Sequence, residues 1–293
     1  MRITNHITTR NALHALQTGL KGLDEAQRRA STGLRVEVAS DDPAASTSIV
    51  GAGSSLRAID QYQRNINAAT ARLAAEEESL GSLTIILERV KELAISQGTA
   101  TASAQTRLTA KAEVDKLMQQ AIQLGNQQYE GEYLFGGDQS HLAPFQAAVP
   151  PFASAPPTGY RRAEIASGLY VRATRNATEV FLNTGVLAAI DQVSTALAAN
   201  DDAAIRTSIY GLDSAHANLQ IILGETGAQS AQLEVADSNL RALDTSLRAF
   251  KSNLQDADLE KAVTDLVSRQ SAYQAAMLST SRIMGMNLTD YLR

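Results

Sequence analysis

Residues 59–90 read IDQYQRNINAATARLAAEEESLGSLTIILERV, and this stretch decides the fold. Its apolar side chains recur in steps of three and four, at Ile59, Tyr62, Ile66, Ala69, Leu73, Leu80, Leu83, Leu87 and Val90. This is the spacing of a heptad seam on one helix face, and a single acidic residue, Glu76, interrupts it. The stretch therefore predicts one long amphipathic helix, about 50 Å at 1.5 Å per residue.

The same spacing returns near both ends of the chain. It runs through Leu13, Leu16, Leu20, Leu23, Gln27, Ala30 and Leu34, then through Leu233, Ala236, Leu240, Leu243, Leu247, Phe250 and Leu254, and, after a shift at Asp256–Asp258, through Val263, Leu266, Gln270, Tyr273, Met277 and Thr280. One such stripe is typical of an ordinary bundle core. Several long stripes at both ends favour a mainly α fold, an elongated helical rod or coiled-coil bundle formed by both chain ends side by side.

Between these ends lies a segment of different character, residues 136–185. It holds all of the prolines except Pro43, and the heptads stop there. Short β-prone runs at Arg161–Ile165, Leu169–Ala173 and Glu179–Leu182 predict strands. The sequence thus predicts three parts: residues 1–40 plus 256–293 as an inner terminal-helix domain, 41–135 plus 186–255 as a helical rod domain, and 136–185 as a small β-rich outer insert.

Composition limits the possible partners. The 26 Lys and Arg against 31 Asp and Glu give a net charge of −5, which disfavours nucleic-acid binding. There is no cysteine, so thiolate metal sites and cysteine nucleophiles are excluded. No apolar run is long enough for membrane insertion, and no cleavable signal peptide is expected at the N-terminus. A secreted chain of this kind would need another export route.

The adjacent acids Asp41 and Asp42 are the first candidates for chemistry. They stand directly before Pro43, which suits the first position of a helix, so capping is favoured over catalysis. A second acidic doublet at Asp201 and Asp202 stands before another predicted helix, Ala203–Leu223, in the same way.

Other patterns are weaker still. Gly51–Leu56 lacks the third glycine of a dinucleotide fingerprint, and the histidines His6, His14, His141 and His216 have no metal-ligand spacing. The sequence predicts no catalytic residue, no cofactor and no metal, and so no enzyme.

Three segments carry a family resemblance. MRITN at residues 1–5, ASTGLRVEVASDDPA at 30–44 and GETGAQSAQLE at 224–234 resemble the terminal regions of the bacterial flagellin family of flagellar axial proteins. Pro43 directly after the aspartates, YLFGG at 133–137 followed by Pro144-Phe145, the opening Met1-Arg2-Ile3 and the ending NLTDYL at 287–292 resemble the members at the hook-filament junction more than the filament members.

The resemblance implies a structural protein of the flagellum that forms a junction between hook and filament, on which flagellin polymerises. It implies export through the type III apparatus with an export chaperone, an extracellular location in the flagellum, self-association into a ring, and contacts with flagellin and an adjacent hook-associated protein. It places an assembly interface at Leu13, Leu16, Leu20, Leu23, Leu266, Tyr273, Met277, Leu288, Tyr291 and Leu292, a helix cap and spoke at Arg35, Asp41, Asp42 and Pro43, and the turn from rod to outer domain at Tyr133, Phe135, Gly136 and Gly137.

Two other interpretations remain open at this stage. A short filament flagellin, from the same family, would be present in thousands of copies and form long polymers. A coiled-coil scaffold without a flagellar role would share only the seams.

Overall fold

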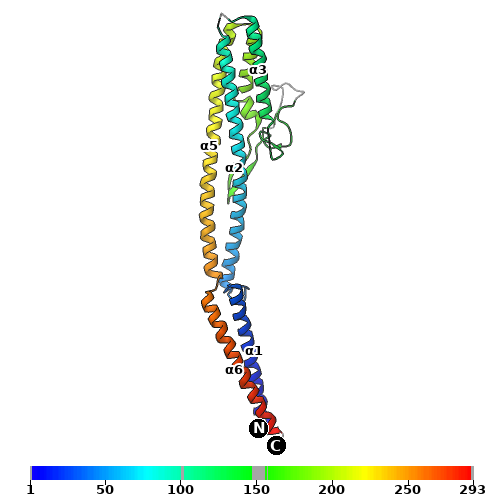
Figure 1. The fold of residues 1–293 in the computed structure, drawn as a ribbon, viewed down its shortest axis with the longest axis vertical. Coiled ribbons are helices and arrows are strands. Elements are labelled where there is room, and N and C mark those ends of the chain that lie inside the picture. The colour runs from blue at the N-terminus through cyan, green and yellow to red at the C-terminus, as the bar shows by residue number, and fades with distance from the viewer. Residues whose placement is uncertain (1, 100–101, 147–155, 157, 292–293) are drawn as a thin grey trace. The chain divides into compact units, whose positions relative to one another are not determined.

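The computed structural model describes residues 2–99, 102–146, 156 and 158–291, with the backbone alone at 2–6, 8–9 and 283–291 (Figure 1). In chain order its elements are α1 (Arg2–Thr32), α2 (Pro43–Gln97), α3 (Ala104–Gly125), β1 (Gln128–Tyr129), β2 (Glu132–Tyr133), β3 (Arg162–Ala166), β4 (Leu169–Arg172), the π-helix η2 (Thr178–Leu182), α4 (Val186–Ala198), α5 (Asp202–Gln255) and α6 (Leu259–Tyr291). The predicted fold class, mainly α with a small β-rich part, is confirmed.

The chain divides into two compact units, and the division differs from the predicted one. Unit 1 comprises residues 1–58 and 242–293, and unit 2 comprises residues 59–241. The breaks expected near residues 40 and 256 exist as the interruptions between α1 and α2 and between α5 and α6. The units, however, divide within α2 and α5, and the expected outer insert belongs to unit 2.

Unit 1 contains α1 and α6 packed side by side, together with the adjoining ends of α2 and α5 (Figure 1). The α1–α6 pair is antiparallel, because Gly19 lies beside Tyr273, Gly22 beside Arg269 and Gly33 beside Leu259. Its described buried apolar residues are few and mostly small: Ala26, Val36, Ala45, Ala52 and Leu56. A pair of helices offers only one mutual interface, so unit 1 has a thin core.

Unit 2 has the substantial core. The seam residues Leu80, Leu83, Leu87 and Val90 of α2 are almost fully buried, and they share one cluster with α3, α4 and α5. Polar contacts fix α2 and α5 antiparallel, since Lys91 pairs with Asp213 and Arg206 donates to the Gly98 carbonyl.

Helices α3 and α4 lie in residues 41–135 and 186–255, which the sequence assigns to a helical rod, but neither was predicted as a separate helix. They pack together, and the Ser194 hydroxyl of α4 donates to the Asp115 carboxylate of α3 at 2.6 Å. Ser103 caps α3 by accepting from the Thr106 N–H at 3.1 Å. In α4 the buried residues Val186, Ile190, Val193 and Leu197 repeat the spacing of three and four, but the helix has only 13 residues and so offers less than two heptads of that pattern.

The β structure of unit 2 consists of two antiparallel hairpins. Strands β1 and β2 pair Gln128 with Tyr133 across a tight turn in which Glu130 and Gly131 both have positive φ, 52° and 81°. Strands β3 and β4 pair Arg162 with Arg172, with an irregularity between Glu164 and Ala166. The first two predicted strands are therefore present to within one residue.

The third predicted strand, Glu179–Leu182, is wrong. This stretch is the π-helix η2, and the Asn176 side-chain oxygen accepts from the Glu179 N–H at 2.8 Å as that turn begins. Helical winding brings Val180 and Phe181 together on the buried side, whereas the alternation of a strand would separate them. Burial of both residues thus outweighs β propensity here.

Three phenylalanines join residues 136–185 to the helical core. The Phe181 ring lies edge-on to both Phe135 and Phe145, with centroids 5.2 and 5.7 Å apart. All three rings are buried in the cluster that contains the α2 and α5 seams. The β-rich part is thus built onto the helical core of unit 2 and shares its apolar interior.

Candidate assembly surface

The α1–α6 pair holds the residues predicted to drive assembly, and two glycines let the helices approach. A Cβ at Gly22 would stand 2.5 Å from Nη1 of Arg269, and one at Gly19 would stand 3.4 Å from Cδ2 of Tyr273. The long side chains of α6 thus lie directly over the glycines of α1.

The structure separates the predicted interface residues into two groups. Leu16, Leu23, Leu266 and Tyr273 are half-buried. Leu13, Leu20 and Met277 remain exposed, by 49%, 53% and 45%. The side chains of Leu288 and Tyr291, and the whole of Leu292, lie outside the described residues.

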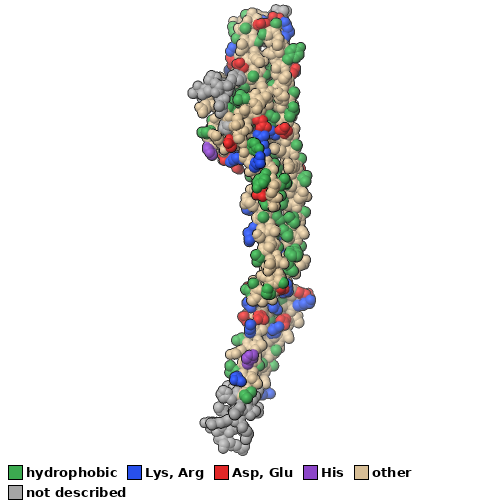
Figure 2. All heavy atoms as spheres, turned by 180° about the vertical axis from the view of Figure 1, so that it is seen from behind, with side chains coloured by type: hydrophobic (Ala, Val, Ile, Leu, Met, Phe, Trp, Pro, Cys, Tyr) green, Lys and Arg blue, Asp and Glu red, His purple; other side chains and the backbone are tan. Residues whose placement is uncertain are grey.

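Further exposed apolar side chains in unit 1 were not singled out from the sequence. They are Ile7, Val38, Val50, Leu259, Val267 and Leu278, and they join the seam residues Leu243, Phe250 and Val263, which are exposed as well. Most lie off the heptad positions, so a search for one seam overlooks them. Figure 2 shows hydrophobic side chains exposed on the surface of the helices. Exposed apolar side chains in this number are typical of a surface that contacts other protein.

A junction of two loops lies next to this pair within unit 1. Arg35 and Val36 donate their N–H groups to the Gln255 carbonyl at 2.7 and 3.2 Å, and Ala257 donates to the Gly33 carbonyl at 2.8 Å. Leu34 and Asp256 form an isolated antiparallel bridge. The α1–α2 loop and the α5–α6 break are therefore held together by main-chain hydrogen bonds.

Arg35 links this junction to the start of α2. Its Nη2 donates to the Leu254 carbonyl at 2.7 Å, in the last turn of α5, where a cation also suits the helix dipole. Its Nη1 lies 3.2 Å from Oδ2 of Asp42. One guanidinium thus connects the end of one helix with the beginning of another.

The two aspartates act locally and differently. Asp42 accepts from the Ala45 N–H at 3.0 Å and so caps α2, which begins at Pro43. Asp41 accepts from the N–H groups of Glu37 and Val38 at 3.0 and 3.1 Å. These hydrogen bonds lower the pKa of both carboxyls, with a smaller contribution from Arg35 at Asp42. Asp258 caps α6 in the same manner and its pKa is lowered too.

The predicted turn from rod to outer domain lies in unit 2. Tyr133 ends β2, Phe135 is fully buried, and Gly137 has a φ of 60°. A Cβ at Gly137 would stand 2.4 Å from the Gly159 carbonyl oxygen, and one at Gly136 would stand 2.8 Å from Cα of Ser140. Both glycines are required by close backbone approach.

Within the described part of the chain, no group of three or more His, Asp or Glu side chains is arranged to hold a metal ion. Of the described helices, none is both long and apolar enough to cross a membrane.

Comparison with known proteins agrees with this architecture. The model of the bacterial flagellin N-terminal helical region matches residues 3–140, and that of the C-terminal helical region matches residues 209–292. The flagellar hook-associated protein 3 of Salmonella typhimurium is 26% identical, over 88% of this chain and 89% of its own.

Two solved structures share the fold. The putative flagellar hook-associated protein from Vibrio parahaemolyticus aligns with a TM-score of 0.66 at 22% identity, over 74% of this chain and all of that one. The flagellar junction protein FlgL from Legionella pneumophila aligns with a TM-score of 0.60 at 16% identity, over 71% of this chain and 99% of its own.

Fold and sequence together define a helical structural protein of the bacterial flagellum, whose partners are other flagellar components. The chain belongs to the bacterial flagellin family. Within that family, the relatives described above are hook-associated and junction proteins.

Proposed function

We propose that this chain forms the junction between hook and filament, on which flagellin polymerises. The observation that carries the proposal is the apolar surface of the α1–α6 pair, where Leu13, Leu20 and Met277 remain about half exposed in the single chain. Such a surface needs neighbouring subunits to cover it. The names of the similar hook-associated and junction proteins support the same position in the flagellum.

The proposal includes a route and a set of partners. The chain leaves the cell through the type III apparatus, accompanied by an export chaperone, and becomes extracellular at the flagellar tip. There it associates with itself in a ring, between an adjacent hook-associated protein and flagellin. Its function is to hold neighbours by packing, and it has no catalytic activity.

Three regions have separate roles in this proposal. The residues of the predicted assembly interface, with Leu288, Tyr291 and Leu292 at the C-terminal end, contact neighbouring subunits. Arg35, Asp41, Asp42 and Pro43 hold the loop junction as the spoke of the inner domain. Tyr133, Phe135, Gly136 and Gly137 fix the point where the chain leaves the helices for the outer β-rich part.

A deletion strain tests the proposal. We expect cells without this chain to build hooks, to release flagellin as monomer into the medium and to lack filaments, as electron microscopy would show. Labelled chain restored to the strain should be confined to a short band at the hook end. Label along the whole filament would instead identify a filament flagellin, and normal swimming of the deletion strain would identify a scaffold outside the flagellum.

A further inference from the structure

The acidic interruption of the α2 seam is explained by a buried ion pair. Glu76 occupies a heptad position and is 1% exposed, as deeply buried as the leucines beside it. Its Oε1 lies 2.6 Å from Nε of Arg175, which is 2% exposed. The Thr226 hydroxyl of α5 donates to the same oxygen at 3.3 Å. A charged residue, paired with Arg175, thus occupies a seam position at which the heptad pattern predicts an apolar side chain.

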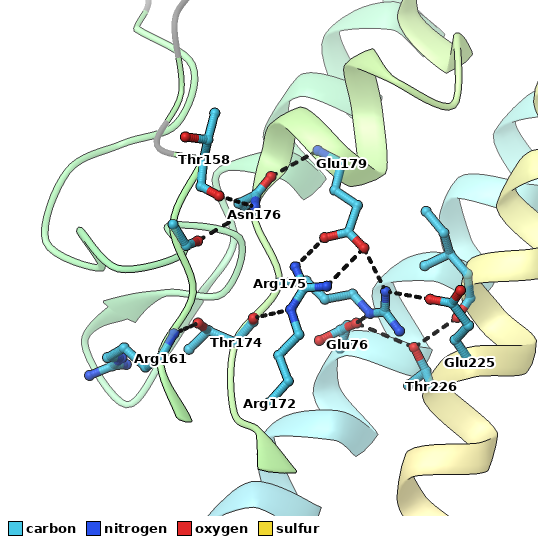
Figure 3. Close-up of polar contacts among 12 residues, drawn as sticks. Glu76, Thr158, Arg161, Arg172, Thr174, Arg175, Asn176, Glu179, Glu225 and Thr226 are labelled. Atoms are coloured by element: carbon cyan, nitrogen blue, oxygen red, sulfur yellow. Dashed lines mark hydrogen bonds and ion pairs between the residues drawn. The ribbon is translucent and has the colours of Figure 1, made fainter. Parts of the chain in front are cut away.

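Arg175 connects three parts of unit 2 (Figure 3). Besides Glu76 of α2, its Nη1 lies 3.0 Å from Oε1 of Glu179 in η2 and 3.1 Å from Oε2 of Glu225 in α5. Arg172 donates to both oxygens of the Glu179 carboxylate, including the Oε1 that Arg175 contacts. The guanidinium can meet these carboxylates together only when residues 172–179 lie at one position against both long helices.

This pair is a poor source of stability. Burial raises the pKa of Glu76, and the nearby Arg175 only partly offsets that effect. Nε of Arg175 is buried and makes no well-aligned hydrogen bond, although it is close to the carboxylate. Removing two charges from water costs about as much as their attraction returns, so apolar side chains of similar volume would serve the core equally well.

The Asn65 side chain of α2 donates to the Glu164 carbonyl at 2.7 Å and so fixes the β3–β4 hairpin against that helix. The contacts around residues 172–182 are less directional. Apolar packing of Val180 and Phe181 against the helices is not directional. The main-chain bonds from Gly137 to the Arg175 carbonyl, and from Ala177 to the Phe135 carbonyl, join the segment to residues 135–137 and not to α2 or α5.

We propose that Arg175 is a positioning residue, which seats residues 172–182 at a single place against α2 and α5 through its contacts with Glu76, Glu179 and Glu225. Apolar packing supplies most of the stability of this region, and the ion-pair network supplies its unique docking. The inference concerns unit 2 alone and is independent of the proposed role at the hook-filament junction.

The test separates docking from stability in the full-length chain. The double variant Glu76→Leu/Arg175→Met completes the α2 seam and removes both buried charges. We expect its melting temperature to equal or exceed that of the parent, while hydrogen exchange at the amides of Ala173, Ala177 and Val180 becomes faster by about tenfold or more. Either single variant should melt lower, because it leaves one buried charge without its main partner.

A matched control replaces an exposed ion pair between the same two helices. Lys91→Met/Asp213→Leu removes a pair whose side chains are 41% and 50% exposed. It should change neither the melting temperature nor the hydrogen exchange at the three amides. A double variant of Glu76 and Arg175 that melts well below the parent, or that keeps parental exchange at the three amides, overturns the proposal. Equal acceleration of those amides in the control overturns it as well.

Discussion

Replacing Leu20 of α1 by aspartate should leave the free chain folded and prevent its assembly. Leu20 is 53% exposed, so about half of the side chain remains to be covered by a neighbouring subunit. Complete burial of a leucine contributes about 1.5–3 kcal/mol, and the half still available contributes about 1 kcal/mol per contact.

Aspartate removes this gain and adds a larger penalty. Burying an ionised carboxylate without a partner costs several kcal/mol, so a total of about 4 kcal/mol would weaken each contact by roughly a thousandfold. In the free chain the same carboxylate stays in water. The helix then loses only about 0.5 kcal/mol from the lower helix propensity of aspartate.

The assay combines a thermal melt of the secreted chain, followed by circular dichroism, with swimming of a deletion strain that carries each variant. Leu16→Asp is the comparison, because Leu16 is half-buried in the α1–α6 pair and its replacement should lower the melt as well. Thr18→Asp is the control, since Thr18 is exposed and lies away from the heptad seam. Normal swimming with Leu20→Asp, or a melt lowered as far as in Leu16→Asp, would refute the reasoning.

Three further substitutions probe the rest of the chain. Gly125→Ala should destabilise unit 2 by about 1–3 kcal/mol in a denaturant titration, because its Cβ would stand 2.5 Å from the Phe145 ring. Arg107→Met should cost about 1–3 kcal/mol in the same titration, because this 5%-exposed guanidinium donates to three main-chain carbonyls that would be left without it. Because the pKa values of Asp41 and Asp42 are lowered on folding, their contribution is complete above the ordinary value of 3.8 and is lost as pH falls below it. The double change to asparagine should therefore flatten the acid limb of the melting temperature against pH, and an unchanged limb would contradict the capping role.

The comparison of sequence with structure is clearest at the long helices. The seam from Ile59 to Val90 lies entirely within α2, and the shift at Asp256–Asp258 falls at the break between α5 and α6. Heptad spacing and helix caps are local properties, in which each residue's role follows from neighbours three or four positions away. For the same reason the cap at Asp42 could be inferred before any contact was known.

The sequence could not distinguish a short apolar helix turn from a short strand at Glu179–Leu182. A strand would place Val180 and Phe181 on opposite faces. Their common burial depends on contacts remote in sequence, such as those of Phe181 with the Phe135 and Phe145 rings. The three-part division stays a prediction. The sequence could not show that three aromatic rings distant in the chain join the β-rich part to the helical core.

The sequence by itself determined the helical class, the seams, the helix starts and the flagellin resemblance, because each depends on spacing along the chain. Tertiary structure decided which seam residues are half-buried in the α1–α6 pair and which remain exposed, and it paired Glu76 with a residue 99 positions away. An amphipathic stripe indicates that one face of a helix will be buried. The element that buries this face is determined by the packing of segments that are remote in sequence.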